Sequence, residues 1–278
     1  MALHRLNYSA MNTNIDTAFA RAPSKHQALL CPFFTAGYPN LAVGPQMLLA
    51  AQEAGAGCIE LGIPFSDPIA DGPVIQESYR LALEGGATVE KSLDMLRQAR
   101  TAGLKIPVLA MVSFSVIFKR GTNEFAKLCC ANGVDGLVLP DLPLEEAPAV
   151  VAALGEHGLG SSLLIAPSTS PDRRRRIAGL CTAFIYYLSV SGITGERASL
   201  PSDIAPNIAQ LRQVTERPIC VGFGIHTAEQ VRQVGSLAEG VIVGSAIIRR
   251  LTEERRRPDS NPVRATHEFI ASLAAGLR

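Results

Sequence analysis

The sequence of 278 residues predicts an α/β protein built as a (β/α)8 TIM barrel, a closed ring of eight parallel strands surrounded by helices. Two observations predict this fold. Eight short runs rich in Val, Ile and Leu alternate with longer stretches that show helical spacing. The apolar runs are continuous rather than alternating, as is typical of strands that are buried on both faces.

Each expected element follows in chain order. The expected strands are Ala28–Thr35, Cys58–Ile63, Ile106–Val112, Gly136–Leu139, Ser162–Ala166, Ala183–Leu188, Pro218–Val221 and Gly240–Val243. The expected helices are Pro45–Ala54, Val89–Ala102, Glu124–Asn132, Glu145–His157, Asp172–Leu180, Ile204–Val214 and Thr227–Val234, with an extra loop helix at Asp71–Glu84 and flanking helices at Asn12–Ala20 and Val263–Leu277. Glycine follows four helical stretches, where a left-handed C-terminal cap is needed, at Gly55, Gly103, Gly133 and Gly158.

These elements are expected to form one domain. No linker rich in Gly, Ser or Pro divides the sequence, so we expect residues 1–278 to fold together. An open, doubly wound sheet is the alternative arrangement for alternating strands and helices.

Composition excludes several classes of protein. Lys and Arg total 26 and Asp and Glu total 25, a balance that gives no general attraction to nucleic acid or anionic lipid. The longest apolar runs, such as Ile106–Val112, are far shorter than the ~20 residues of a membrane span, and Met1–Ala10 lacks the apolar stretch of a secretory signal. The six cysteines form no C-x-x-C pair, so we interpret them as core thiols in a reducing compartment and expect a cytoplasmic protein.

The basic runs and the histidines suggest no special site. Arg173–Arg176, Arg249, Arg250 and Arg255–Arg257 are interpreted as solvated surface. The five histidines are scattered, without the spacing of a metal site, so no metal is expected.

A carboxylate inside the second strand is the first candidate for chemistry. Strand alternation places Glu60 on the same face as Gly62, and in a barrel that face can point into the mouth, where active sites of this fold lie. Burial raises the pKa of an unpaired carboxyl, and a carboxyl that titrates near neutral pH is suited to general acid–base catalysis. The alternative is a glutamate paired with backbone donors or with a distant basic side chain.

The loop after this strand carries two more acids. Pro64, Pro68 and Pro73 stiffen it, so that Asp67 or Asp71 can be held over the same mouth and share acid–base work with the strand glutamate. Ordinary turn or helix-cap roles for both aspartates are the alternative.

Three small-residue loops predict a phosphate site. Gly222–Ile225 and Gly244–Ile248 follow the last two strands, the usual place for phosphate in these barrels, and Ser191–Gly195 follows the sixth. Glycine lets an anion approach backbone N–H groups, and Ser245 can begin a short helix whose N-terminus favours negative charge. Phe33, Tyr186 and Phe223, at strand ends, are candidates for the walls of an aromatic subsite.

The residues from Glu60 to Gln76, ELGIPFSDPIADGPVIQ, resemble the signature of tryptophan synthase alpha subunits. Further matches follow in order along nearly the whole chain. They are Pro32–Pro39, Gly133–Gly136, Pro140–Pro143, Tyr186–Gly195, Gly222–Ile225 and Gly244–Ile247.

The resemblance implies a barrel enzyme of L-tryptophan biosynthesis that cleaves indole-3-glycerol phosphate to indole and glyceraldehyde 3-phosphate by retro-aldol lysis. In this reading Glu60 protonates indole C3 and assists cleavage, and Asp71 holds the indole N–H and stabilises positive charge on the ring. The resemblance further implies that Phe33, Tyr186 and Phe223 line the pocket, that Gly195, Gly224, Gly244 and Ser245 bind phosphate, and that Thr194 lies in a loop that closes over the site.

A partner is implied as well. Members of this family pair with a beta subunit that carries pyridoxal phosphate, in an alpha2beta2 complex, and Pro64, Asp67 and Pro143 fall where the family contacts it. No cofactor is expected in this chain itself.

One stretch departs from the pattern. Where the family carries a Tyr- and Asn-containing run, this chain has Ser113 and Ser115, which affects the shape of the pocket and the coupling to the partner. A stand-alone lyase that releases free indole and a non-catalytic regulatory subunit are the alternative functions.

Overall fold

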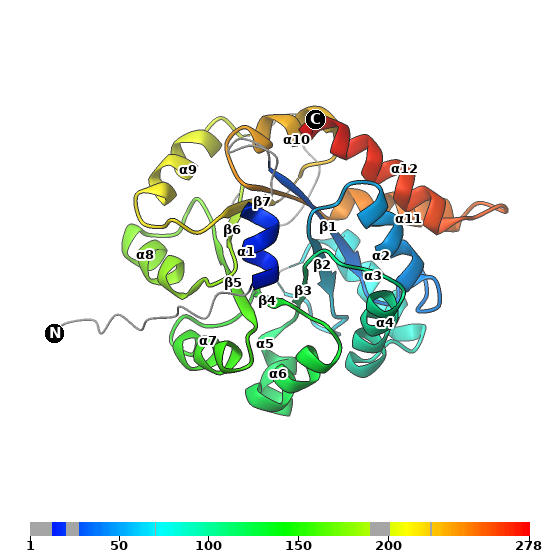
Figure 1. Cartoon of the computed structure of the whole chain (residues 1–278), viewed down its shortest axis with the longest axis horizontal. Coiled ribbons are helices and arrows are strands. Elements are labelled where there is room, and N and C mark those ends of the chain that lie inside the picture. The colour runs from blue at the N-terminus through cyan, green and yellow to red at the C-terminus, as the bar shows by residue number, and fades with distance from the viewer. Residues whose placement is uncertain (1–12, 21–27, 70, 190–200, 223) are drawn as a thin grey trace.

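The computed structural model describes residues 13–20, 28–69, 71–189, 201–222 and 224–278. Eight parallel strands are hydrogen-bonded in the order β1 to β8, and β8 pairs with β1 to close the ring. This closure confirms the predicted barrel and excludes the open, doubly wound sheet. Figure 1 shows the helices arranged around the strands.

The strands begin and end within two residues of their expected positions. They are β1 Leu29–Thr35, β2 Ile59–Gly62, β3 Val108–Met111, β4 Gly136–Leu139, β5 Gly160–Ile165, β6 Ile185–Leu188, β7 Ile219–Gly222 and β8 Gly240–Val243. Nearly every strand residue is buried, as the continuous apolar runs predict.

The helices include all those expected. They are α1 Thr13–Ala20, α2 Gly44–Glu53, α3 Pro73–Glu84, α4 Val89–Thr101, α5 Phe114–Arg120, α6 Thr122–Ala131, α7 Ala147–Glu156, α8 Pro171–Leu180, α9 Ile204–Arg212, α10 Ala228–Gly235, α11 Ser245–Arg255 and α12 Pro262–Ala274, which a short 3-10 turn, Ala275–Leu277, follows. The glycines Gly55, Gly103, Gly133 and Gly158 all have positive φ, between 72° and 109°, which confirms the predicted caps.

Two helices differ from expectation. The helix α5 was not expected, because its apolar residues and short length hide its periodicity. Ser113 caps it by accepting a hydrogen bond from the backbone N–H of Ser115. The short helix expected at Ser245 extends over eleven residues as α11.

The first helix covers the end of the barrel opposite to the carboxyl ends of the strands, and Figure 1 shows it in front of the strands. Its Ile15 is buried against β4 and β5: a Cβ added to Gly136 or Gly160 would lie 3.2 Å or 3.0 Å from Ile15 Cδ1. Phe19 packs edge-on against Phe184 before β6, with ring centroids 6.0 Å apart. The two glycines therefore make the space that this helix fills.

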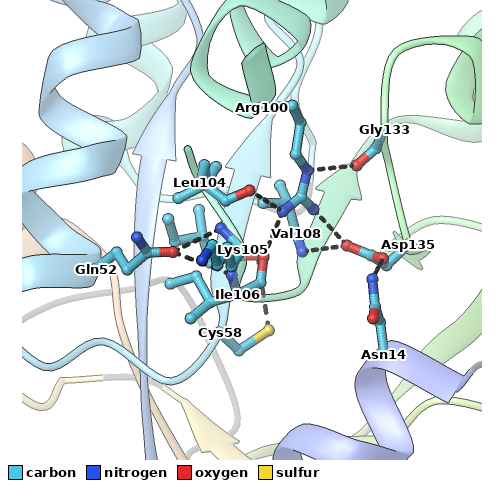
Figure 2. A network of polar contacts seen from close by, with 11 residues as sticks. Asn14, Gln52, Cys58, Arg100, Leu104, Lys105, Ile106, Val108, Gly133 and Asp135 are labelled. Atoms are coloured by element: carbon cyan, nitrogen blue, oxygen red, sulfur yellow. Dashed lines mark hydrogen bonds and ion pairs between the residues drawn. The ribbon is translucent and has the colours of Figure 1, made fainter. Parts of the chain in front are cut away.

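A polar network ties the same helix to the barrel (Figure 2). Asn14 Nδ2 donates to Asp135 Oδ1 at 2.8 Å, and Arg100 Nη2 and the backbone N–H of Val108 donate to Asp135 Oδ2 at 2.6 Å and 2.8 Å. The Arg100 guanidinium also donates to three backbone carbonyls, including that of Gly133 at 3.0 Å. These donors offset the free-energy cost of burying the Asp135 carboxylate.

Two expectations about side chains need correction. Five of the six cysteines are buried and free, as expected, but Cys130 is exposed on α6. Arg174 is buried rather than solvated, because its side chain turns toward α9 and donates to Gln210 Oε1 at 2.8 Å, while Arg173, Arg175 and Arg176 are exposed. In the described ranges, no helix has the length and apolar character needed to cross a bilayer.

Candidate active site

A cavity opens at the carboxyl ends of the strands, the end where this fold places its chemistry. Most of the residues singled out from the sequence line it together. The lining residues are Phe33, Glu60, Asp71, Ile75, Met111, Tyr186, Gly224, Ile225, Ile242, Gly244, Ser245, Ala246 and Arg249. Thr194, Gly195 and Phe223, also singled out, lie outside the described residues.

Glu60 lies on β2 and points into this cavity, as alternation predicts. It pairs in register with Phe33 of β1 and is only 3% exposed. Its Oε1 has no hydrogen-bond partner within the described part of the chain. Burial, with a smaller contribution from the nearby Asp71 charge, raises the pKa of Glu60 to about 8. Such a carboxyl can hold or release a proton near neutral pH.

Asp71 reaches the same cavity from the loop between β2 and α3. The loop is held by one backbone bond and one side-chain bond. The N–H of Asp71 donates to the Pro68 carbonyl at 3.1 Å, and Gln76 Nε2 of α3 donates to the Asp71 carbonyl at 2.8 Å. Burial, and then the charge of Asp141, raise the pKa of Asp71 to about 7. Two carboxyl groups with raised proton affinity therefore face one cavity.

Asp141 follows β4 and is fixed by two donors. Ser113 Oγ donates to its Oδ2 at 2.6 Å, and the backbone N–H of Phe114 donates to its Oδ1 at 2.7 Å. Asp141 was not expected in the site, although an acid two residues after a barrel strand is a usable signal.

A second, smaller cavity adjoins the first. Asp71 and Met111 line both cavities, whereas Glu60 lines only the first. The remaining walls come from the loop after β2, from α3 and from the ends of β3 and β4, and they include Ser113 and Asp141.

Aromatic walls depend on two glycines. A Cβ on Gly62 would lie 2.5 Å from Phe33 Cζ and 2.5 Å from the Tyr79 hydroxyl, and a Cβ on Gly222 would lie 2.7 Å from the Tyr186 hydroxyl. Only glycine lets these rings lie across the strand ends. Phe33 and Tyr186 thus line the cavity as expected.

The part of the cavity formed after β7 and β8 suits an anion. Gly244 precedes α11, and the N–H groups of Ser245 and Ala246 in its first turn lie outside the helical hydrogen-bond ladder. Gly224, with φ of 78°, contributes backbone from the loop after β7. Free N–H groups and the positive end of a helix dipole favour a phosphate here.

Arg249 corrects a sequence interpretation. It was expected on the surface, yet it is half-buried, it lines the cavity, and its Nε and Nη2 atoms are shielded from solvent. It follows Ser245 by four residues on α11, so the two share one face of the helix. That spacing from Ser245, where a phosphate site was expected, is the signal that could have identified it.

Of the three residues expected at a partner interface, two are exposed and one is buried. Asp67 and Pro143 are exposed, whereas Pro64 is buried. Ile69, two residues after Asp67, is 83% exposed, and Phe118 of α5 is 75% exposed. In the described residues no group of three His, Cys, Asp or Glu side chains could hold a metal ion.

Comparison with known sequences gives consistent matches. A family model described as tryptophan synthase alpha chain matches residues 19–276. The tryptophan synthase alpha chain of Rhodopirellula baltica is 39% identical over 272 residues, which cover 96% of this chain and 98% of the relative. That of Synechococcus elongatus is 44% identical over 243 residues, which cover 87% of this chain and 91% of the relative.

Solved structures agree. Mycobacterium tuberculosis tryptophan synthase matches with a TM-score of 0.85 at 32% identity, covering 95% of this chain and 98% of that one. A mutant tryptophan synthase alpha-subunit from Pyrococcus furiosus matches with a TM-score of 0.81 at 31% identity, covering 90% and 98%.

Proposed function

The chain belongs to the tryptophan synthase alpha chain family, lyases of tryptophan biosynthesis that cleave indole-3-glycerol phosphate, and we propose that Glu60 and Asp71 carry out this cleavage. The observation that carries the proposal is the Glu60 carboxyl, buried in the barrel mouth with Oε1 unpartnered in the described structure and a pKa of about 8. A group with that proton affinity can act as acid and then as base.

Glu60 acts first as the acid. Protonated Glu60 gives its proton to indole C3, and the ring nitrogen becomes positively charged. The resulting Glu60 carboxylate then takes the proton of the glycerol hydroxyl next to the ring. As that C–O–H becomes an aldehyde, the bond to C3 breaks and its electron pair returns to the ring. Indole and glyceraldehyde 3-phosphate form, and Glu60 ends protonated as it began.

Asp71 complements this cycle. As a carboxylate it accepts a hydrogen bond from the indole N–H and stabilises the positive charge that C3 protonation creates. Its charge is effective because the site is poorly solvated, as the pKa of about 7 reflects. Ionised Asp71 and protonated Glu60 are the pair of states that the reaction needs.

Phosphate binding is proposed at the other end of the cavity. The start of α11 with Gly244 and Ser245, the backbone at Gly224, and the Arg249 guanidinium surround one region of it. Phe33 and Tyr186 are proposed as walls for the indole ring. Roles for Thr194, Gly195 and Phe223 rest on the family resemblance.

A beta subunit carrying pyridoxal phosphate is the proposed partner, in an alpha2beta2 complex, and this chain is proposed to need no cofactor of its own. The exposed apolar side chains of Ile69 and Phe118, with the exposed Asp67 and Pro143, support an interface formed by α5 and the loops after β2 and β4. We also propose work in the cytoplasm, which free buried thiols support.

The test measures indole release from indole-3-glycerol phosphate by the purified chain, alone and with a beta subunit. We expect activity that rises on addition of the partner and falls by 100-fold or more (roughly the contribution of general acid–base catalysis) in Glu60→Gln. Full activity without any partner effect would favour the stand-alone lyase, and activation of the beta subunit without any indole release would favour the regulatory subunit. Activity unchanged in Glu60→Gln would contradict the acid–base role.

A further inference from the structure

The second cavity enlarges the indole end of the site. It shares Asp71 and Met111 with the catalytic cavity but does not reach Glu60, so it extends the site past Asp71. Its other walls are mostly apolar and include Ile63, Val112 and Pro140.

Ser113 keeps this space open. Its hydroxyl is held against the wall by the 2.6 Å bond to Asp141 and accepts the capping hydrogen bond from the N–H of Ser115 at 3.3 Å. Asp141 is held in turn by the N–H of Phe114. A small side chain fixed in this way cannot turn to fill the cavity, and the sequence already departs here from the tyrosine expected by resemblance.

The position of Asp71 orients the indole relative to this space. Asp71 accepts the hydrogen bond of the ring N–H in the proposed function. Among the benzene-ring carbons that can carry a substituent, C7 lies nearest to that nitrogen. A substituent on C7 points past Asp71. The apolar walls suit a methyl group, whereas the Asp141 carboxylate disfavours an anionic substituent.

We propose that this chain processes indole-3-glycerol phosphates whose benzene ring carries a small apolar substituent at C7, with the substituent in the second cavity. The inference rests on the proposed function, because it uses the orientation set by Asp71. Ser113 is then a specificity-determining residue for the reaction.

The test uses the reverse reaction, condensation of glyceraldehyde 3-phosphate with 7-methylindole, 4-methylindole or indole, followed as kcat/KM. We expect the unaltered chain to use 7-methylindole within about tenfold of indole. Ser113→Tyr should lower kcat/KM for 7-methylindole at least tenfold more than for indole, since one misplaced methyl in an apolar pocket changes discrimination by roughly 10- to 200-fold. The ratio of kcat/KM for 4-methylindole to that for indole should be the same in Ser113→Tyr as in the unaltered chain, because the methyl group on C4 lies away from the ring nitrogen.

The control is Ser115→Tyr, which adds the same side chain two residues later at an exposed position. We expect it to leave kcat/KM for each methylindole relative to indole unchanged. Ser113→Thr retains the hydroxyl and adds one methyl, so it decides the question if Ser113→Tyr fails to fold. An unchanged preference in both Ser113 variants, or no use of 7-methylindole by a chain that uses indole, overturns the inference. No reaction with indole itself counts against the proposed function instead.

Discussion

Replacing Glu60 with glutamine should remove lysis and, at alkaline pH, stabilise the folded chain. In the unfolded chain this carboxyl titrates near its ordinary pKa of 4.5, whereas in the fold its pKa is raised to about 8 by burial. Between these values the folded state holds a proton that the unfolded state has released. Stability therefore falls as pH rises from about 4.5 to about 8, and glutamine removes this dependence.

The size of the effect follows from the same values. Each tenfold difference in proton affinity is worth about 1.4 kcal/mol, so ionising buried Glu60 costs about 5 kcal/mol once the pH is above about 8. Between pH 5.5 and pH 8.5, the difference in free energy of unfolding between Glu60→Gln and the unaltered chain should grow by about 3 kcal/mol in favour of the variant.

Urea unfolding followed by circular dichroism at pH 5.5, 7.0 and 8.5 measures this difference. Any pH-independent effect of the amide cancels, because only the change in the difference matters. Glu53→Gln, at an exposed position on α2, is the control for loss of a surface carboxylate. If the free energies of unfolding of Glu60→Gln and of the unaltered chain change in parallel across this pH range, Glu60 does not ionise at a buried site and the reasoning is wrong.

Three further predictions concern the two ends of the barrel. Gly244→Val should raise KM for indole-3-glycerol phosphate tenfold or more with little change in Tm, because the atoms nearest to a Cβ there belong to Phe33 and none lies closer than 3.6 Å. An unchanged KM would remove Gly244 from the phosphate site. Arg249→Gln should raise KM about tenfold with a small change in kcat, because one charge-assisted hydrogen bond to the phosphate is lost. The control Arg255→Gln, at an exposed position on the same helix, should leave KM unchanged. Equal KM values in the two variants would contradict phosphate binding by Arg249. Asp135→Ala should lower the free energy of unfolding, measured in urea, by about 3 kcal/mol and leave KM unaltered, and a changed KM with unchanged stability would refute a purely structural role.

The strands were predictable because they are apolar throughout, and the exceptions have a physical cause. The fifth strand was expected to begin at Ser162 but begins two residues earlier, at Gly160, and it includes the buried polar residue Ser161. Ser161 Oγ donates to the Leu180 carbonyl at 2.8 Å, and the Phe184 N–H donates to Ser162 Oγ at 3.3 Å. Hydrogen bonds to distant residues make such burial possible, and local hydrophobicity does not record them.

The site was predictable where strand alternation decides the direction of a side chain, as for Glu60. Arg249 and Asp141 were missed for different reasons. Which face of α11 turns toward the mouth depends on how that helix packs, so a basic run looked like surface. The charge of Asp141 raises the pKa of Asp71, although the two residues lie on loops that are far apart in the sequence. Such proximity arises only when β2, β3 and β4 pair side by side.

The helix that covers the base of the barrel also constrains the order in which the chain can assemble. Asn14 and its partner Asp135 are 121 positions apart, and Asp16 forms an ion pair at 3.5 Å with Arg217, still further along. On the ribosome, α1 emerges long before anything to which it can dock. It stays undocked until more than half of the polypeptide has been made. Although α1 is the first of the described helices to be synthesised, it is therefore among the last of them to reach its place.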